Sequence, residues 1–237
     1  LVTEFGPMAS AEVILLDEIN PIPLKSQSAF LEALQDPTIT VGKTTYDLPS
    51  FSFAIATMNR VELGQGTFPL SEAATDRFAA MVNIGYLPPE EEEKLVNFDF
   101  KQVRLNPLLS KQRIIELRAR INQQVFLHDR LGKYIQRLVA ATRPFNPDTD
   151  WRIHSPSELV ERGVDLGASP RAIICWSRLA KVWALLQRER AEVFPEDIHD
   201  LAPFVLGHRI WLGPHAAAHG LTSEQVIRDV IDQVPIP

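Results

Sequence analysis

The sequence predicts an α/β fold with a mainly parallel sheet covered by helices, followed by an all-helical second domain. In the first part of the chain, short apolar runs alternate with loops and helical patterns, which is typical of parallel sheets. After Leu87-Pro88-Pro89, apolar residues recur at helical spacing instead. The 237 residues suffice for one large domain or two small ones. We therefore expect one domain over 1–87 and a second over 88–237.

The composition excludes several classes of protein. Hydrophobic residues make up 45% of the chain and charged residues 23%, which is enough apolar material for a folded core. The net charge of −6 disfavours broad binding to nucleic acid. A single cysteine cannot form an internal disulfide, so nothing demands an oxidising compartment. Since no apolar run approaches the roughly 20 residues of a membrane span and no signal peptide is visible, we expect a cytoplasmic protein.

Strands and helices alternate in the first half. Val13-Ile14-Leu15-Leu16 is an apolar run that ends in charge, as expected for a central strand buried on both faces. Gly42-Lys43 separates two β-rich runs and predicts a hairpin, while Ser71 is a good N-cap for a short helix. The expected order is a strand at 13–16, a helix at 24–35, a hairpin at 39–46, a strand at 51–57, a helix at 71–78 and a strand at 81–86.

The second half opens with a signal for a helix start. Pro88-Pro89 precedes four glutamates, and proline and acidic residues both favour the first turn of a helix. The alternative for these glutamates is an acidic docking site. The segment 143–167 contains turn residues and predicts a long connection. Further helices are expected near 110–123, 129–142, 170–190, 196–206 and 222–233.

Three polar side chains follow the first two apolar strands. Asp17 and Glu18 come directly after the first strand, and Asn59 follows the second. Because ligands of parallel sheets bind at the carboxyl ends of the strands, Asn59 should lie beside the two acids if the strands are neighbours. There, one carboxylate can hold Mg²⁺ through water, the other can activate a nucleophile, and the amide can hydrogen-bond a phosphate oxygen. The alternatives are an exposed acidic strand end and an Asx turn.

Two arginines stand at helix ends. Arg77 lies at the end of the short helix at 71–78, where it can form a surface ion pair or reach the phosphate of a neighbouring subunit. Ser169-Pro170-Arg171 has the order of an N-cap, N1 and N2. This order places the Arg171 guanidinium where the helix dipole already favours an anion. The alternative for Arg171 is a capping residue without a ligand.

The helix that follows Arg171 carries an apolar stripe at three- and four-residue steps. This spacing predicts core positions, so Cys175 is expected to be a small core residue rather than a nucleophile. The tryptophans of the stripe are likewise expected in the core rather than at a cofactor. The stripe consists of Ala172, Cys175, Trp176, Leu179, Val182, Trp183 and Leu186.

Other motifs each lack an essential part. His215 and His219 are four residues apart but without the glutamate of a zinc-hydrolase helix, and Gly64-Gln65-Gly66 lacks the third glycine of a dinucleotide loop. The histidines and the cysteine show no zinc-ligand spacing, and the sequence contains no Gly-x-Ser-x-Gly elbow. We therefore expect no metal at the histidines, no dinucleotide loop at 64–66 and no serine nucleophile on such an elbow.

Taken together, the motifs resemble the MoxR family of AAA+ ATPases, in order along nearly the whole chain. Gly6-Pro7 and Ile14-Leu15-Leu16-Asp17-Glu18-Ile19-Asn20 resemble its Walker B segment, and Ala56-Thr57-Met58-Asn59 resembles its sensor 1. The resemblance implies a P-loop NTPase-type sheet, present here in part, followed by an AAA+ lid domain. The other matches are the helix after Walker B at 25–35, the hairpin before sensor 1 at 40–46, the arginine-finger region at 66–78, the start of the sensor 2 helix at 167–172 and a late lid segment at 205–209.

The resemblance also implies roles for the candidate residues. Asp17 would help to hold Mg²⁺ through water, Glu18 would position or activate the attacking water, and Asn59 would sense the γ-phosphate of ATP. Arg77 would act in trans as the arginine finger, and Arg171 would be the sensor 2 arginine, acting on its own subunit's nucleotide or on a neighbour's. The family forms rings, usually hexamers, and matures or remodels other proteins as a chaperone, often with a von Willebrand factor A-type partner.

The sequence departs from the family pattern at three points. Pro21 replaces the usual arginine, which removes a positive charge beside the carboxylates, and Met58 replaces the usual glutamine. The phosphate loop Gly-x-x-x-x-Gly-Lys-[Ser/Thr] does not occur in the 237 residues. Because the chain begins with Leu1 close to the Walker B segment, we expect this loop upstream, in a longer protein. The alternatives are a non-hydrolysing adaptor of the same fold and, against the acidic charge, a nucleic-acid motor.

Overall fold

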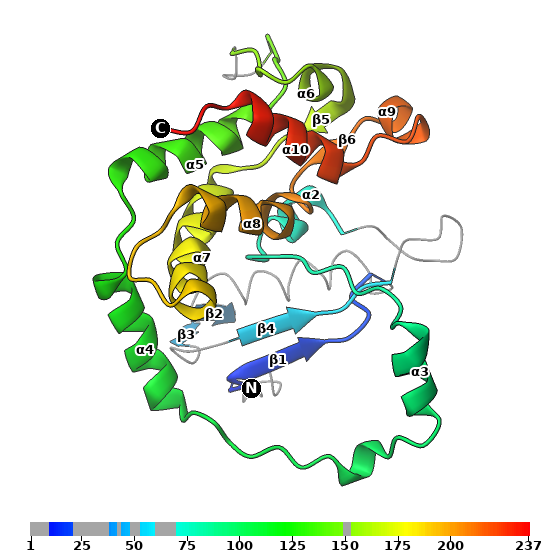
Figure 1. Ribbon diagram of the computed structural model, residues 1–237, viewed down its shortest axis with the longest axis vertical. Coiled ribbons are helices and arrows are strands. Elements are labelled where there is room, and N and C mark those ends of the chain that lie inside the picture. Colours follow the sequence, from blue (N-terminus) through cyan, green and yellow to red (C-terminus); the bar gives the residue numbers. More distant parts are fainter. Residues whose placement is uncertain (1–9, 21–37, 42–43, 48–52, 60–69, 149–152) are drawn as a thin grey trace.

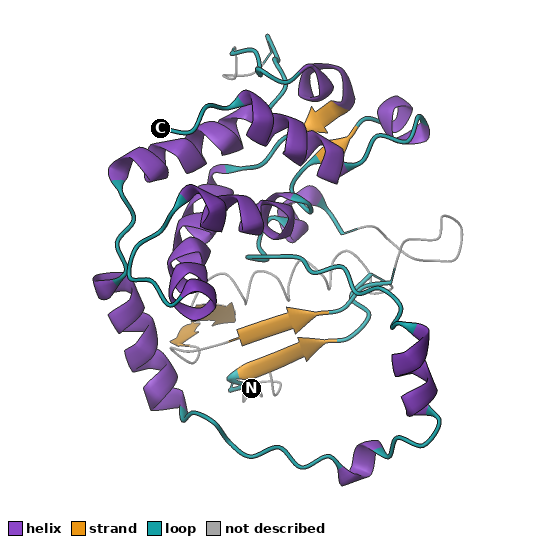
Figure 2. Cartoon of the chain, viewed as in Figure 1, coloured by secondary structure: helices purple, strands orange, loops and turns teal. Residues whose placement is uncertain are grey.

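The computed structural model describes residues 10–20, 38–41, 44–47, 53–59, 70–148 and 153–237. A pair of parallel strands lies beside a group of packed helices, and a long segment runs around the outside from one to the other (Figure 1). Helices make up most of the regular structure, and the strands are short (Figure 2). The predicted α/β fold, with a parallel sheet followed by a helical part, is therefore confirmed. The boundary at 87/88 stays a prediction.

The parallel pair consists of β1 (Val13–Leu16) and β4 (Phe53–Ala56). Val13 is 65% exposed and Leu15 64%, whereas the alternate side chains are half-buried. Because successive side chains of a strand point to opposite faces, only one face of the pair is covered in the described part of the chain. The prediction that the first strand is buried on both faces is therefore wrong for these residues. The covered face belongs to a small apolar cluster of Ile19, Leu70 and Ala74 with Leu16, Ala56 and Phe78.

The predicted hairpin is confirmed. β2 (Thr38–Val41) and β3 (Thr44–Asp47) pair in antiparallel fashion, with Val41 opposite Thr44. The turn residues 42–43 and the predicted helix at 24–35 lie outside the described residues.

Helix α2 (Glu72–Thr75) begins at the predicted N-cap. The Ser71 hydroxyl accepts the backbone N–H of Ala74 at 3.3 Å, which satisfies one amide that the first helical turn leaves without a partner. The helix ends earlier than the predicted 71–78, and the chain continues as a turn through Arg77.

Residues 81–86 form no strand, so this prediction is wrong. Met81 donates its backbone N–H to the carbonyl of Phe204 at 2.9 Å, which directs the chain towards helix α8 (Pro195–Leu206). Ile84 is 93% exposed and Tyr86 99%. A strand needs a neighbour that shares its backbone hydrogen bonds, and within the described ranges no strand lies beside 81–86.

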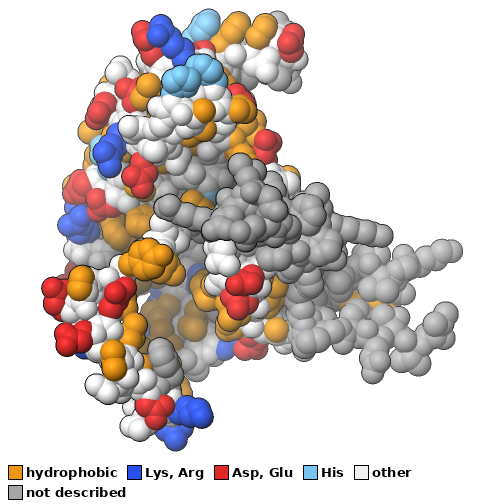
Figure 3. Space-filling view, turned by 90° about the vertical axis from the view of Figure 1, so that its right-hand side faces the viewer, with side chains coloured by type: hydrophobic (Ala, Val, Ile, Leu, Met, Phe, Trp, Pro, Cys, Tyr) orange, Lys and Arg blue, Asp and Glu red, His pale blue; other side chains and the backbone are white. Residues whose placement is uncertain are grey.

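The long outer segment carries α3 (Pro89–Leu95), the 3₁₀ helix η2 (Phe100–Gln102) and α4 (Lys111–Gln124). α3 begins with proline and glutamates, as predicted, and all of its side chains are exposed. Several large apolar side chains along the segment are also exposed, and Figure 3 shows hydrophobic side chains among charged ones on one face of the molecule. An ion pair between Lys111 and Glu12, 2.5 Å long, joins the start of α4 to the residue before β1.

Helices form at all five of the ranges near 110–123, 129–142, 170–190, 196–206 and 222–233, and several short elements form that the periodicity does not predict. The segment 143–167, expected to be a connection without regular structure, holds α6 (Glu158–Gly163) and β5 (Val164–Leu166). These elements are too short for a periodic pattern to develop, so the sequence signal was weak. The remaining elements are α5 (Asp129–Ala141), α7 (Pro170–Arg188), β6 (Trp211–Leu212), α9 (Pro214–Ala218) and α10 (Ser223–Gln233).

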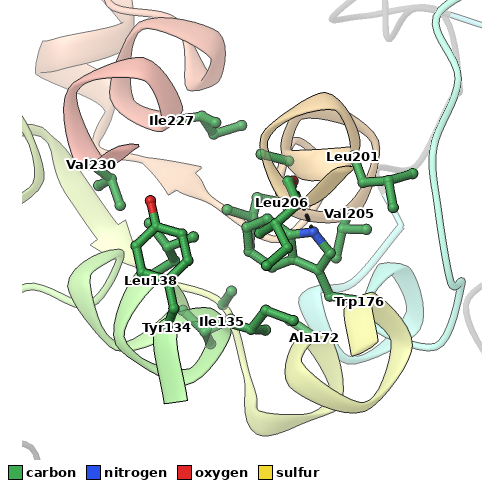
Figure 4. Close-up of a cluster of buried hydrophobic side chains, with 14 of the residues drawn as sticks. Tyr134, Ile135, Leu138, Ala172, Trp176, Leu201, Val205, Leu206, Ile227 and Val230 are labelled. Carbon is green, nitrogen blue, oxygen red and sulfur yellow. Dashed lines mark hydrogen bonds between the residues drawn. The ribbon is translucent and has the colours of Figure 1, made fainter. Parts of the chain in front are cut away.

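The main core lies between α5, α7, α8 and α10 (Figure 4). Trp176 is fully buried, and its indole N–H donates to the carbonyl of Ile198 at 3.1 Å, which joins α7 to α8. Tyr134 of α5 is also fully buried at this core. None of the helices in the described ranges combines the length and apolarity that a membrane crossing requires.

The apolar stripe predicted for α7 is correct only in part. Ala172 and Trp176 are fully buried, but Cys175 is only half-buried and Leu186 is 66% exposed. Small residues take the other central positions, because neighbouring helices approach α7 closely. The fully buried residues of the helix are Ala172, Trp176, Ala180 and Ala184.

Gly167 precedes α7 at a point where no side chain fits. A Cβ built there would lie 2.2 Å from the backbone carbonyl oxygen of Thr142, and backbone cannot move aside as a side chain can. We expect Gly167→Ala to lower the free energy of unfolding by about 2–4 kcal/mol in urea titrations. Gly132→Ala is the control, because α5 has open space at Gly132, and it should raise stability by about 0.5–1 kcal/mol. Equal urea midpoints for the two variants would contradict the close approach of Gly167 to Thr142.

Candidate functional site

The candidate site forms where β1 and β4 end side by side. Backbone pairing continues past both strands, because the N–H of Thr57 donates to the carbonyl of Leu16 at 2.9 Å and the N–H of Ile19 donates to the carbonyl of Thr57 at 3.0 Å. Ile19 is fully buried, so the turn that carries Asp17 and Glu18 is fixed at its far end.

Asp17, Glu18 and Asn59 lie together, as the prediction from neighbouring strands requires. The amide Nδ2 of Asn59 donates to Oε1 of Glu18 at 3.1 Å. Thr57 links the two acids: its hydroxyl donates to Oδ1 of Asp17 at 2.6 Å and accepts the backbone N–H of Glu18 at 2.9 Å. All four side chains are exposed, so a ligand can reach them.

The sequence analysis missed the roles of Thr57 and Asn20. Thr57 stands two residues before Asn59 at the end of the same strand, and this position was the available signal. Asn20 is 1% exposed, and its Nδ2 donates to the backbone carbonyl of Asn59 at 3.2 Å. Within the described part of the chain, Oδ1 of Asn20 is buried without a hydrogen-bond partner. The two residues together fix the backbone on which Glu18 and Asn59 stand.

Glu18 adopts a left-handed backbone conformation, with φ of 49°. Among the described residues other than glycine, only Glu189, at the end of α7, shares this feature. Such a conformation costs on the order of 1 kcal/mol or more and persists only where the surroundings impose it, often at functional sites. Here the bond from the Glu18 amide to Thr57 and the burial of Ile19 impose it.

The oxygen atoms of this cluster suit Mg²⁺. The ion prefers carboxylate, hydroxyl and water oxygens, and proteins commonly bind it through one or two carboxylates together with phosphate oxygens of a substrate. Asp17 and Glu18 supply two exposed carboxylates. The donors present therefore fit a magnesium–nucleotide complex better than a metal held by protein ligands alone.

The two candidate arginines, Arg77 and Arg171, contact residues in and directly after α2. Arg77 donates from Nη1 to the carbonyl of Ala73 at 2.6 Å, at the end of α2. Arg171 is the N2 residue of α7. Ser169 is the N-cap, as predicted, and its hydroxyl accepts the backbone N–H of Arg171 at 3.1 Å. The Arg171 guanidinium lies 3.4 Å from a carboxylate oxygen of Asp76.

The Asp76 carboxylate contacts three side chains of the helical part, which are Arg171, Ser169 and Arg209. The Ser169 hydroxyl lies 2.8 Å from both carboxylate oxygens, and Nε of Arg209 lies 3.0 Å from Oδ1. The Arg209 side chain is 1% exposed, and it also donates to the backbone carbonyls of Asp76, Phe78 and Ala79. The turn after α2 is therefore joined to the helical part by a buried ion pair and a set of hydrogen bonds, and α2 lies beside the end of α8 in Figure 1.

His208 contacts the same turn. Its Nε2 lies 3.0 Å from the carbonyl oxygen of Phe78, and its Nδ1 has no hydrogen-bond partner among the described residues. Burial, and then the adjacent Arg209 cation, lower the pKa of His208 to about 4, although the Asp76 carboxylate acts in the opposite direction. The ring is therefore neutral at pH 7.

This pKa predicts an acid-sensitive fold. Between pH 6.5 and about 4 the unfolded chain gains a proton on His208 that the folded chain does not, so stability should fall as the pH drops through this window, by about 3 kcal/mol at most. Urea unfolding at pH 4.5 and 7.5 measures the loss. His208→Gln should reduce it, and the same substitution at the exposed His219 should not. A loss unchanged by His208→Gln would contradict the buried neutral ring.

Two family models match the chain. The model described as the ATPase family associated with various cellular activities (AAA) matches residues 1–80, and the model of the AAA lid domain matches residues 157–230.

Similar proteins are known in several bacteria. The chain is 36% identical to the uncharacterized protein YeaC of Bacillus subtilis, covering 98% of this chain and 67% of that protein. It is also 36% identical to Chaperone MoxR1 of Mycobacterium tuberculosis, covering 99% and 60%, and 27% identical to Protein MoxR of Methylorubrum extorquens, covering 95% and 66%. The chain thus spans between 60% and 67% of the length of these relatives.

A solved structure agrees with these matches. The crystal structure of a candidate ATPase from Cytophaga hutchinsonii superposes with a TM-score of 0.82 at 37% identity, covering 99% of this chain and 68% of that one. Identity of this extent to proteins that carry the MoxR name, together with the AAA family model, shows that the chain belongs to the MoxR family of AAA+ ATPases.

Proposed function

We propose that this chain carries part of the active site of an ATPase that uses ATP hydrolysis to remodel or mature a partner protein. The observation that supports this most directly is the joined cluster at the strand ends. Asn59 holds the Glu18 carboxylate at 3.1 Å, while Thr57 holds Asp17 and the Glu18 amide. An acid oriented in this way can accept a proton from an attacking water, and a neutral amide beside it can bind a phosphate oxygen.

Asp17 would hold Mg²⁺ through water, together with the phosphates of ATP. Bound there, the ion would neutralise charge that develops on the phosphate oxygens. Thr57 would keep Asp17 oriented towards this position, because its hydroxyl already donates to one carboxylate oxygen. Glu18 stays available for the water, since its own contact is with the side chain of Asn59.

The two arginines would complete the site from outside the cluster. Arg171 stands in the first turn of α7, where its charge and the helix dipole both favour a phosphate. Arg77 would act in trans as an arginine finger on the nucleotide of a neighbouring subunit, in a homo-oligomeric ring, expected to be a hexamer. A guanidinium suits this task because it is always charged and can bind two phosphate oxygens together.

The output of the cycle would be work on another protein. One relative is named a chaperone, which supports a role of this kind. We expect a von Willebrand factor A-type protein as a partner, and we do not expect nucleic acid as a target. The competing hypothesis is an adaptor of the same fold that hydrolyses nothing, and a missing or damaged phosphate loop upstream would indicate it. The N-terminal sequence of the native protein, read by mass spectrometry, separates the two hypotheses.

Removing the acid of Glu18 tests the hydrolytic role. In the intact native protein, Glu18→Gln should leave ATP binding within about twofold and slow turnover by about 100-fold or more, because the amide cannot accept the proton. Glu90→Gln is the matched control, on an exposed face of α3. Binding by fluorescence titration and turnover by phosphate release give both quantities. Normal turnover in Glu18→Gln would remove this residue from the mechanism.

Thr57 provides a second, graded test. Thr57→Val keeps the shape of the side chain but removes the bonds to Asp17 and to the Glu18 amide. We expect turnover to fall by about tenfold and the dependence on Mg²⁺ to shift to higher concentrations. Thr57→Ser retains the hydroxyl and should restore most of the activity. Equal activity of the valine and serine variants would show that this hydroxyl plays no part.

A further inference from the structure

Several hydrogen bonds attach the turn at 76–81 to residues of the helical part that are distant in the sequence. Backbone carbonyls of this turn accept hydrogen bonds from Arg209, and the carbonyl of Phe78 also contacts His208. At the end of the turn, the N–H of Met81 donates to Phe204 at 2.9 Å. Arg209 and His208, which follow α8, therefore hold both neighbours of Arg77.

The two arginines that contact Asp76 differ in how firmly they are held. The Arg209 side chain is 1% exposed and pairs with Asp76 at 3.0 Å. The Arg171 side chain is 44% exposed, and its distance to the same carboxylate is longer, at 3.4 Å. A buried ion pair is costly to break, whereas a partly exposed pair contributes little. Arg209 is therefore the permanent partner of Asp76, and Arg171 is the one that an anion can draw away.

We propose that Asp76 is a positioning residue that couples the nucleotide site to Arg77, because Arg171 and the buried Arg209 share its carboxylate. This proposal rests on the functions proposed above for Arg77 and Arg171. When Arg171 moves to a phosphate, Asp76 keeps only Arg209 and Ser169, and the turn that carries Arg77 is released on one side. Binding in one subunit would in this way change the arginine that the subunit offers to its neighbour.

Hydrogen exchange tests the attachment without any nucleotide. In the intact native protein, Asp76→Asn should raise the exchange rate of the Met81 amide about tenfold or more, because its bond to Phe204 depends on the anchored turn. The amides paired between β1 and β4 should keep their rates. An unchanged rate at Met81 would overturn the proposal, whether or not the protein hydrolyses ATP.

Nucleotide kinetics test the coupling. In Asp76→Asn, Arg171 loses its competing carboxylate, so the Kd for ATP should fall about two- to fivefold, the range that a partly exposed ion pair supports. Turnover should fall about tenfold or more, because Arg77 is no longer held in position. A purely structural role would instead weaken binding and turnover together, and this result would overturn the proposal.

Two further variants separate the proposal from a general loss of stability. Asp197 is fully buried at the other end of α8, where it pairs with Arg190 at 2.8 Å, so Asp197→Asn should destabilise the helical part without tightening ATP binding. If Asp76→Asn does not fold, the double variant D76N/R209M leaves no buried charge without a partner, and it should show the same opposed changes. If the wild-type protein does not hydrolyse ATP, this result refutes only the proposed function, because the hydrogen-exchange measurement needs no hydrolysis.

Discussion

The parallel pairing of β1 with β4 is the constraint on which the candidate site depends. The strands run in one direction and end in register, with Leu16 opposite Ala56, so the residues that follow both strands emerge at one edge. The backbone bonds of Thr57 continue this register past the strand ends. A shift of one residue would turn every side chain of a strand to the opposite face, and the acids would then lose the hydroxyl that joins them.

A buried ion pair joins the turn after α2 to the helical part. A guanidinium has five N–H donors and stays ionised, so a buried Arg209 needs a counter-ion and several acceptors. Asp76 and the carbonyls at the end of α2 provide both. Removing one partner of a buried pair costs about 3–5 kcal/mol, and the donor directions allow few alternative arrangements. The ion pair therefore gives this junction a defined geometry, whereas an apolar contact is not directional.

Features that depend on neighbours in the sequence were predicted more successfully than features that depend on contacts between distant segments. The apolar run of β1, the serine caps of α2 and α7 and the long helices were all readable, because each depends on neighbours in sequence. The strand expected at 81–86 was wrong because its fate depends on a partner strand. At the site, the placement of Asp17, Glu18 and Asn59 followed from topology. The pairing of Arg171 with Asp76, 95 residues away, had no local signal.

The length of α7 has a mechanical consequence. Its 19 residues span roughly 28 Å at 1.5 Å per residue, and the junction with Asp76 lies at its first turn. The Trp176 hydrogen bond and the ion pair of Arg188 with Asp200 fix α8 against α7, so the two helices would move together. A rotation of about 10° at the first turn therefore displaces the far end by roughly 5 Å. A small change of angle around one carboxylate would thus be amplified along α7, because the displacement grows with the length of the helix.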